Sequence, residues 1–251
     1  MKTNGNDISR FLLLCGVFAP VMMMFTIFIV GQITQDYNPI SDSISQMGIP
    51  DRPYSILLNA GYVVYGMLIG LAARGLSISM GLTTRAKRIA LLLSIHAIGT
   101  MLLGIFPDSL DLPAKPFSAD LIHNIVSAVS LLPLLVSILV FRGIARGEKA
   151  LKVVGILGLV VIAINLPMPL INYIGAIDPI SGLIQRILCG SAFCWLSLTF
   201  ILLYRKRYRL GSEYRTISYY STAAVENTET VRSDRVIFHS INLKGRSYPT
   251  K

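Results

Sequence analysis

The sequence is poor in charged residues. Asp, Glu, Lys and Arg make up 14% of its 251 residues, whereas about a quarter of the residues of a soluble domain are charged. Apolar residues make up 53% of the chain, and the mean hydropathy is +0.62. This shortage of charge argues against a soluble globular domain and favours an integral membrane protein.

Acidic residues are scarcer than basic ones. The chain has 13 Asp and Glu against 23 Lys and Arg, which gives a formal net charge of +10. The basic residues stand in short segments between apolar blocks and in the C-terminal part of the chain, and they form no basic stripe interleaved with aromatic residues. We therefore expect no nucleic-acid partner, and membrane lipids with anionic headgroups are the expected partner of this charge.

Cysteines and catalytic motifs are also missing or few. The three cysteines, Cys15, Cys189 and Cys194, all lie in apolar blocks and show no metal-ligand spacing. They are interpreted as small apolar packing residues, so no metal site and no cofactor is predicted. The chain has no Gly-x-Ser-x-Gly, no P-loop and no Gly-x-Gly-x-x-Gly. No reaction can be assigned from these patterns.

Six apolar blocks are long enough to span a membrane, which needs about 20 helical residues. The blocks cover Phe11–Ile33, Ser55–Ser77, Ile89–Phe106, Leu121–Phe141, Leu151–Ile171 and Leu183–Tyr204. The fold class predicted is therefore all-α, a polytopic transmembrane bundle of six helices. Gly66 and Gly70 form a GxxxG in the second block, which indicates close helix packing, and Leu166–Pro169 is a candidate break in the fifth.

Positive charge alternates between the connections. Short connections on one side carry most Lys and Arg, whereas the connections on the other side are longer and rich in Asp, Pro and Ser. The basic sets precede the first block, lie between the second and third and between the fourth and fifth, and follow the sixth. The positive-inside rule then places both termini in the cytoplasm. The membrane is expected to be the inner or plasma membrane of the cell.

Three regions follow from this pattern. Residues 1–10 are predicted to be a cytoplasmic N-terminus, and residues 11–204 a six-helix transmembrane domain. Residues 205–251 are basic, rich in Ser, Thr and Tyr, and lack apolar periodicity. We expect them to form a disordered cytoplasmic tail.

Ionisable residues near or inside the spans are the candidates for function, because charge is costly there. Most of them gather at the outer side, and they are Asp42, Asp108, Asp111, His123, Gln185 and Arg186, whereas His96 lies near the middle of the third block. In a compact bundle they converge on an outward-facing polar pocket. We expect Arg186 to point inward and to pair with Asp108 or Asp42.

Each candidate also has a purely structural interpretation. Arg186 can extend to lipid headgroups, His96 can be a neutral histidine bonded across helices, His123 can contact headgroups, and Asp108 can cap a helix end. A sharper alternative is a metal-dependent hydrolase of lipids, with a zinc ion held by His96, His123 and Asp108. No spacing in the sequence fixes these three together.

Short motifs at these positions resemble one known family. They are Tyr37–Gly48 after the first block, Asn59–Gly61 and Gly66 in the second, Gly104–Asp108 closing the third, His123 opening the fourth and Gly182–Arg186 opening the sixth. In this order and spacing they resemble the domain-of-unknown-function 998 family, prokaryotic six-helix membrane proteins. The resemblance covers residues 8 to 205.

The resemblance implies a membrane helix bundle without an established activity. It points to five positions, Asp42, Ser45, Asp108, His123 and Arg186, as ligand-binding candidates of the outer pocket. The resulting hypothesis is an integral membrane protein whose outward-facing pocket binds a small molecule or a lipid headgroup. The alternatives are the membrane-embedded lipid hydrolase and a structural or partner-binding subunit.

Overall fold

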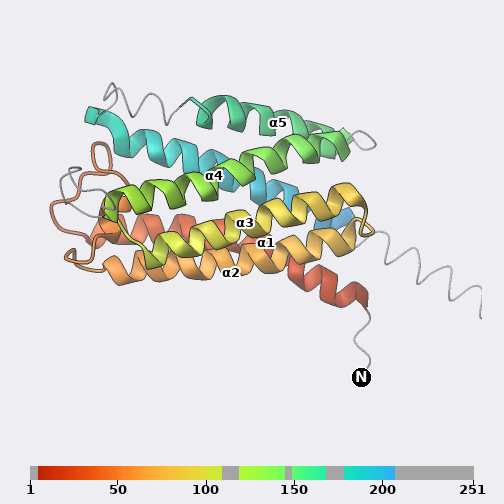
Figure 1. The fold of residues 1–251 in the computed structure, drawn as a ribbon, viewed down its shortest axis with the longest axis horizontal. Coiled ribbons are helices and arrows are strands. Elements are labelled where there is room, and N and C mark those ends of the chain that lie inside the picture. The colour runs from red at the N-terminus through yellow and green to blue at the C-terminus, as the bar shows by residue number, and fades with distance from the viewer. Residues whose placement is uncertain (1–4, 109–118, 145–148, 168–177, 207–251) are drawn as a thin grey trace, which may run out of the picture. The chain divides into compact units, whose positions relative to one another are not determined.

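The structure, a computed structural model, describes residues 5–108, 119–144, 149–167 and 178–206. Six α-helices run side by side along one direction, and this part of the chain contains no strand (Figure 1). The helices are α1 (Gly5–Ile33), α2 (Ser55–Ser79), α3 (Thr84–Ile105), α4 (Ala119–Ile144), α5 (Lys149–Asn165) and a sixth helix, Ser181–Lys206. Two short 3₁₀ turns, Ser45–Gly48 and Asp178–Ile180, lie between them. The predicted all-α fold with six helices is confirmed.

Five of the described helices are long and apolar enough to cross a membrane, and α5 is not among them. The fifth block was expected to continue to Ile171, but α5 ends at Asn165 after 17 residues. Pro167 explains this end, because proline has no N–H and its ring clashes with the carbonyl group four residues earlier. At 1.5 Å per residue, α5 is about 25 Å long, so the expected full-length span is wrong for this helix within the described residues.

The third helix is longer than its apolar block. It begins at Thr84, and the Thr83 side chain accepts a hydrogen bond from the Ala86 N–H at 3.2 Å, as an N-cap residue does. The first turn carries Arg85, Lys87 and Arg88. Hydropathy alone missed this turn, because its residues are helical but not apolar.

Small residues bring α2 and α3 into close contact. A side chain at Gly66 would collide with the Ala97 carbonyl and Met101, and a side chain at Gly104 would collide with the Asn59 carbonyl. The backbones of the two helices therefore come close to each other at two levels. The GxxxG of α2 packs inside the chain, as predicted for a packing motif.

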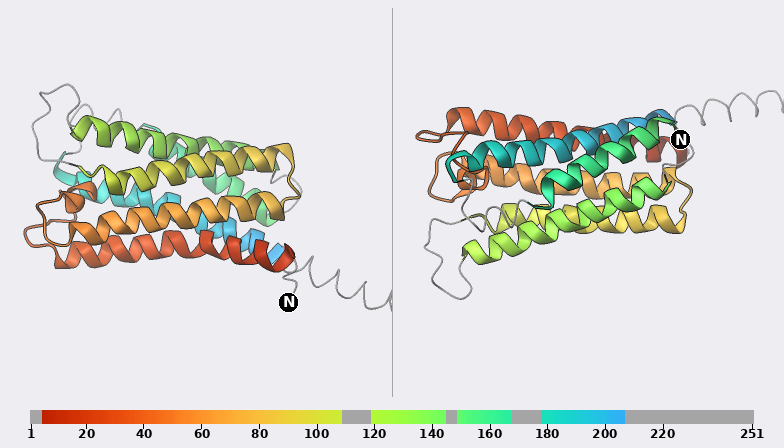
Figure 2. Two further views of the ribbon diagram at one scale, coloured as in Figure 1. Left: turned by 60° about the horizontal axis from the view of Figure 1, so that its bottom comes forward. Right: turned by 90° about the horizontal axis from the view of Figure 1, so that it is seen from above.

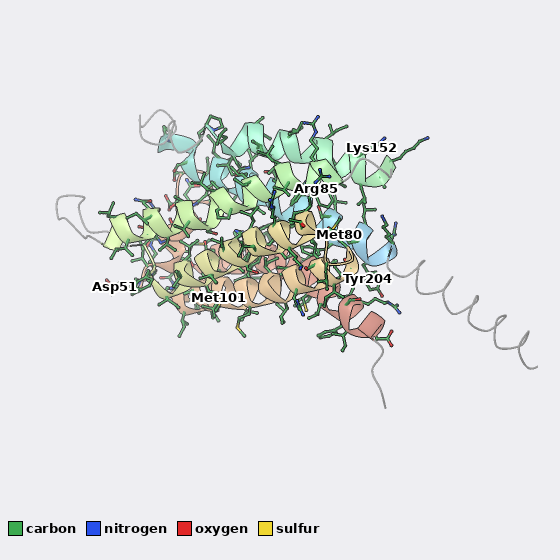
Figure 3. The ribbon with its side chains drawn as sticks, turned by 45° about the vertical axis from the view of Figure 1, so that its right-hand side comes forward. Asp51, Met80, Arg85, Met101, Lys152 and Tyr204 are labelled. Atoms are coloured by element: carbon green, nitrogen blue, oxygen red, sulfur yellow. The ribbon has the colours of Figure 1, made fainter. Side chains whose placement is uncertain are left out.

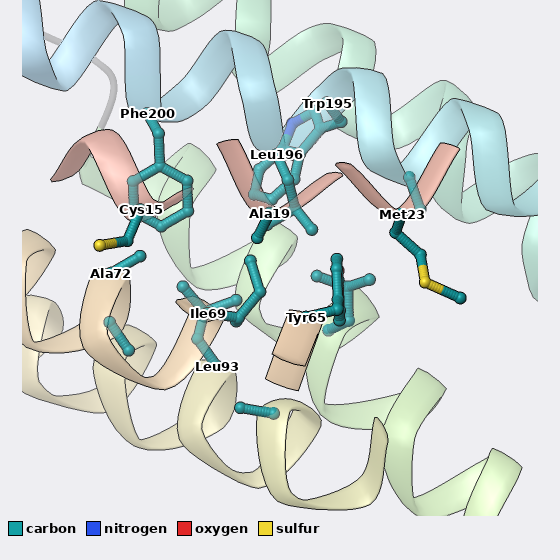
Figure 4. Packing of buried hydrophobic residues seen from close by; sticks show 14 of the residues in the cluster. Cys15, Ala19, Met23, Tyr65, Ile69, Ala72, Leu93, Trp195, Leu196 and Phe200 are labelled. Atoms are coloured by element: carbon teal, nitrogen blue, oxygen red, sulfur yellow. The ribbon is translucent and has the colours of Figure 1, made fainter. Parts of the chain in front are cut away.

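All six helices contribute buried apolar side chains to the core, and Figure 4 shows the part of it that α1, α2, α3 and the sixth helix form. Tyr65 and Phe200 are among its largest buried side chains. Trp195 donates its indole N–H to the Val154 carbonyl of α5 at 3.0 Å, which satisfies a polar group that would be costly in an apolar surrounding. The same hydrogen bond joins the sixth helix to α5.

The two ends of the bundle differ in their charged residues. Asp51 lies at one end, and Arg85 and Lys152 lie at the other (Figure 3). The first end also carries residues 34–54, here called loop 1, which joins α1 to α2 (Figure 2). Of the predicted tail, only Arg205 and Lys206 belong to the described residues, where they extend the sixth helix. The rest of the tail lies outside the described residues.

Candidate functional site

Loop 1 lies against the start of the sixth helix through a row of main-chain carbonyl groups. The Leu183 N–H donates to the Ile40 carbonyl at 2.9 Å, and the Ser181 hydroxyl donates to the Ser41 carbonyl at 2.5 Å. The first N–H groups of a helix have no partner within the helix. Loop 1 therefore supplies acceptors that this helix start needs.

Two further features fix the same contact. The Gln185 side-chain oxygen accepts a hydrogen bond from the Ile44 N–H. Gly182 leaves room for loop 1, because a Cβ atom there would collide with the carbonyl of Asp42 and meet that of Pro39 at 2.9 Å. Glycine is thus required at this position by a close approach of two backbones.

Arg186 holds the centre of this contact. Its Nη1 donates to the Pro39 carbonyl at 2.8 Å, to the Gly182 carbonyl at 2.9 Å and to the Asp42 carbonyl at 3.3 Å. Its Nη2 donates to the hydroxyl of Tyr37. The planar guanidinium can serve several acceptors at once, which an ammonium group cannot do in the same geometry.

The expected pairing of Arg186 with a carboxylate is wrong. In the described part of the chain, no carboxylate oxygen lies within 4.0 Å of its guanidinium nitrogens. Arg186 does point into the protein, but its partners are neutral oxygens. The reason is that loop 1 presents its carbonyl groups, rather than the Asp42 side chain, to the sixth helix.

The Asp42 carboxylate is used inside loop 1. One oxygen accepts from the Asn38 N–H at 2.9 Å, and the other accepts from the Ser41 hydroxyl at 2.9 Å. The Asn38 side chain in turn accepts from the Ile40 N–H at 3.0 Å. These are local side-chain to backbone bonds of the kind that fix tight turns. Asp42 thus shapes the segment whose carbonyl groups bind Arg186.

Tyr37 connects loop 1 to Arg186. Its hydroxyl donates to the carbonyls of Asp42 or Ser43, at 3.0 and 3.2 Å, and accepts from Arg186. Burial raises the pKa of the Tyr37 phenol above its ordinary value, and the hydrogen bond from Arg186 opposes part of this rise. The phenol therefore remains protonated near neutral pH and can donate to loop 1.

The other three predicted residues form separate contacts at the same end of the bundle. The Ser45 hydroxyl donates to the Asp108 carboxylate at 2.8 Å, which joins loop 1 to the segment after α3. His123 Nδ1 donates to the Phe106 carbonyl at 3.1 Å, which joins the start of α4 to the end of α3. No hydrogen bond or ion pair connects His123 to Arg186 among the described residues. The structure thus places all five predicted residues at one end of the bundle, where Arg186 and Asp42 belong to one set of contacts and Ser45, Asp108 and His123 belong to others.

Below loop 1, a groove runs between α1 and the sixth helix. Its volume is about 210 Å³ and its lining residues are Met24, Ile27, Phe28, Ile44, Arg186, Cys189, Gly190 and Phe193. Phe28 and Met24 are 63% and 44% exposed, while Ile27 and Ile44 are buried. The groove therefore lies at the outer surface of the bundle, with a floor of buried apolar residues. Arg186 is its one charged lining residue.

A second polar cluster lies inside the bundle at His96. Its Nδ1 is 2.9 Å from the Ser130 carbonyl of α4, and its Nε2 is 3.0 Å from the Tyr65 hydroxyl of α2. Because a carbonyl only accepts, Nδ1 carries the proton and Nε2 accepts from Tyr65. The histidine is thus bonded across helices, as the structural interpretation predicts. Pro133, one turn after Ser130, lies in the same part of α4.

The proposed zinc ligands do not assemble. His96 bonds to Tyr65 and Ser130, and His123 bonds to Phe106. Over the described ranges, no three His, Cys, Asp or Glu side chains lie close enough together to hold a metal ion. The residues present therefore give no basis for metal-assisted hydrolysis at this position.

Sequence reasoning missed two parts of the site. Tyr37 stands in the motif Tyr37–Gly48, but the sequence does not show that its hydroxyl binds Arg186, because aromatic residues often follow a membrane span for other reasons. The groove residues Met24, Phe28 and Phe193 give no signal, because lipid-facing and groove-lining apolar residues look alike in a sequence. The sequence did contain one local signal of the site. Gly182, four residues before Arg186, is a glycine at which two backbones come close together.

Comparison with known proteins agrees with the family suggested by the motifs. The chain matches no curated protein and no solved structure. A family model described as "Protein of unknown function (DUF998)" matches residues 17–202. This match contains α2, α3, α4 and α5, most of α1 and of the sixth helix, loop 1 and every residue that binds Arg186. With its long apolar helices, the chain is a multi-pass membrane protein that belongs to the DUF998 family.

Proposed function

We propose that this protein binds a membrane lipid, with an acyl chain of the lipid lying in the groove between α1 and the sixth helix. One observation carries the proposal: the groove is lined by apolar side chains, lies at the outer surface of a membrane bundle and has Arg186 as its one charged residue. In this proposal the ligand lies beside Arg186, rather than in a polar pocket shared by all five candidates.

The shape and lining of the groove favour a chain over a compact polar molecule. Binding sites for drug-sized molecules usually have about 300–1,000 Å³, and this groove is smaller, at about 210 Å³. Its side walls include the exposed side chains of Met24 and Phe28, so an acyl chain can enter sideways from the surrounding lipid. An extended chain segment buries apolar surface in such a groove without any polar partner along its length.

Gly190 leaves part of the groove open. Apart from the adjoining backbone of the same helix, no atom lies within 4 Å of the position that a Cβ atom would take at this residue. Gly190 stands four residues after Arg186 and thus on the same face of the sixth helix. A larger residue at this position would fill the space proposed for the acyl chain.

A purely structural role is the competing proposal for Arg186 alone. Its hydrogen bonds to Pro39, Asp42, Gly182 and Tyr37 support such a role. The two roles are compatible, because the bonds use Nη1 and Nη2, whereas Nε makes no hydrogen bond to the described residues. The lipid proposal differs from a purely structural role in requiring the groove, which the hydrogen bonds of Arg186 do not use.

We also propose that the protein lies in the inner or plasma membrane with both termini in the cytoplasm, which is the orientation that the charges suggest. The segregation of Asp51 from Arg85 and Lys152 supports it (Figure 3). Under this orientation the groove opens toward the outer leaflet. Reporter fusions near Arg85 and after Arg209 should report cytoplasm, and a fusion near Asp51 should report the opposite side. A cytoplasmic signal near Asp51 would contradict this orientation.

Native mass spectrometry of the detergent-purified protein tests the groove. We expect the wild type to retain dioleoyl phospholipid, and Gly190→Leu to lose at least about 80% of this adduct while folding normally. Gly143→Leu is the matched control, because Gly143 also has open space around its Cβ position and does not line the groove. Equal lipid retention by both variants would refute the proposed function.

A further inference from the structure

The geometry points to an anionic phospholipid as the occupant of the groove, with its phosphate bound by Arg186. This inference rests on the proposed function and names the class of lipid. It commits to the lipid rather than to a free anion, because the cation and the apolar groove form one continuous lining.

The partners of Arg186 leave its charge uncompensated. Its hydrogen-bond acceptors are the carbonyls of Pro39, Asp42 and Gly182 and the hydroxyl of Tyr37, which are all neutral. The Asp42 carboxylate is bound by Asn38 and Ser41 instead. The guanidinium thus has strong local partners, but no counter-charge in contact with it among the described side chains.

The bound guanidinium can still attract an anion. Carbonyl partners fix the position of the guanidinium without cancelling its charge. Arginine and phosphate form charge-assisted hydrogen bonds, which are about twice as strong as neutral ones. Arg186 lines the groove, and its bonds to described residues use Nη1 and Nη2 but not Nε, so an anionic oxygen in the groove would meet a fixed cation with a donor left for it.

The apolar part of the groove fits the tail of the ligand. Directly below Arg186, the groove continues along Cys189, Gly190 and Phe193 of the sixth helix and along Phe28 and Met24 of α1. One phosphate at Arg186 and one acyl chain along these residues would occupy the groove together. A zwitterionic headgroup presents the same phosphate with an additional cation, which Arg186 repels. A net negative headgroup is therefore preferred.

Gly190 offers a way to cancel the charge without touching the contacts of Arg186 with loop 1. A carboxylate at position 190 would stand four residues from Arg186, where side chains on one helix face each other. Gly190→Glu would therefore neutralise Arg186 inside the groove. Gly190→Gln has nearly the same size but no charge, and it is the matched control for the space that the new side chain fills.

The experiment compares lipids that differ only in the headgroup. Native mass spectrometry is performed on the full chain with equal amounts of dioleoyl phosphatidylglycerol and dioleoyl phosphatidylcholine. We expect the wild type to prefer phosphatidylglycerol by about tenfold, which corresponds to about 1.4 kcal/mol. Gly190→Gln should keep this preference, even if total binding falls, and Gly190→Glu should reduce it to less than about twofold.

The outcomes separate this inference from the proposed function. If the wild type binds both lipids equally and Gly190→Leu removes both, the groove binds lipid but the anionic class is wrong. The inference also fails if Gly190→Glu keeps the preference, or if Gly190→Gln loses it. Displacement of the lipid by inorganic phosphate would make a free anion the ligand and would overturn the lipid assignment. If Gly190→Leu changes the binding of neither lipid, the proposed function itself fails.

Discussion

Arg186 Nη1 lies 2.8 Å from the carbonyl oxygen of Pro39, although the two residues are 147 positions apart in the chain. This contact fixes loop 1 on the start of the sixth helix and holds a cation at the mouth of an apolar groove. Stability and ligand binding thus depend on the same side chain, and separate experiments can test each role.

Arg186 and Tyr37 should be energetically coupled. Arg186→Leu and Tyr37→Phe each remove one partner of the same hydrogen bond, so the double variant should lose less stability than the sum of the two single variants. A coupling of about 0.5–3 kcal/mol is expected for residues in one network. Thermal unfolding in detergent measures the cycle. Strict additivity would show that loop 1 is not held through this pair.

Gly182→Ala should destabilise the protein by about 1–3 kcal/mol, because its methyl group would push loop 1 away from the sixth helix. The matched control is Gly190→Ala in the same helix, where the methyl group meets open space. This control should be neutral or slightly stabilising, since alanine favours the helix. Similar melting temperatures for the two variants would argue against the close backbone contact.

Tyr65→Phe should cost about 1 kcal/mol, because it removes the hydroxyl that donates to His96 inside the bundle. Tyr62→Phe is the control from the same helix, since Tyr62 forms no hydrogen bond with a described residue. The control should change the free energy of unfolding by only a few tenths of a kcal/mol. Equal effects of the two changes would mean that the Tyr65–His96 bond contributes nothing measurable.

The contact between loop 1 and Arg186 should weaken at alkaline pH. The pKa of Tyr37 is raised above its ordinary value of 10.0 in the folded protein, so the folded state holds the phenolic proton more tightly than the unfolded state. The contribution of Tyr37 to the free energy of unfolding is therefore fully present below about pH 10 and falls as the pH rises above that value. The charged groups that act on Tyr37 are Arg186, Asp42 and Arg52.

Proteolysis of loop 1 as a function of pH measures this effect. Cleavage should increase above about pH 10 in the wild type, whereas Tyr37→Phe should show a weaker dependence on pH in this range. An identical pH dependence in both proteins would exclude Tyr37 as the titrating group.

The number and positions of the helices could be predicted from the sequence, because a membrane span requires about 20 apolar residues in one block. The exceptions have local causes. The Thr83 cap and the basic first turn extended α3 beyond its apolar block, and Pro167 shortened α5. Hydropathy does not report either effect.

The site could be predicted only in part. Charge placement selected Arg186, Asp42, Asp108 and His123, the family resemblance added Ser45, and these residues do lie at one end of the bundle. The partners of Arg186 could not be predicted, because most of them are main-chain carbonyls. Every residue has such a group, so the sequence gives no signal for it. The groove could not be predicted either, since Met24, Phe28 and Phe193 become its walls only through the packing of α1 against the sixth helix.

The most direct test of the account is an experimental structure of the full chain in phosphatidylglycerol-containing nanodiscs. We predict density for one acyl chain between Phe28 and Phe193, ending in a headgroup at Arg186, with Arg186 still bonded to the carbonyls of loop 1. An empty groove with Arg186 paired to the carboxylate of Asp42 or Asp108 would contradict the account.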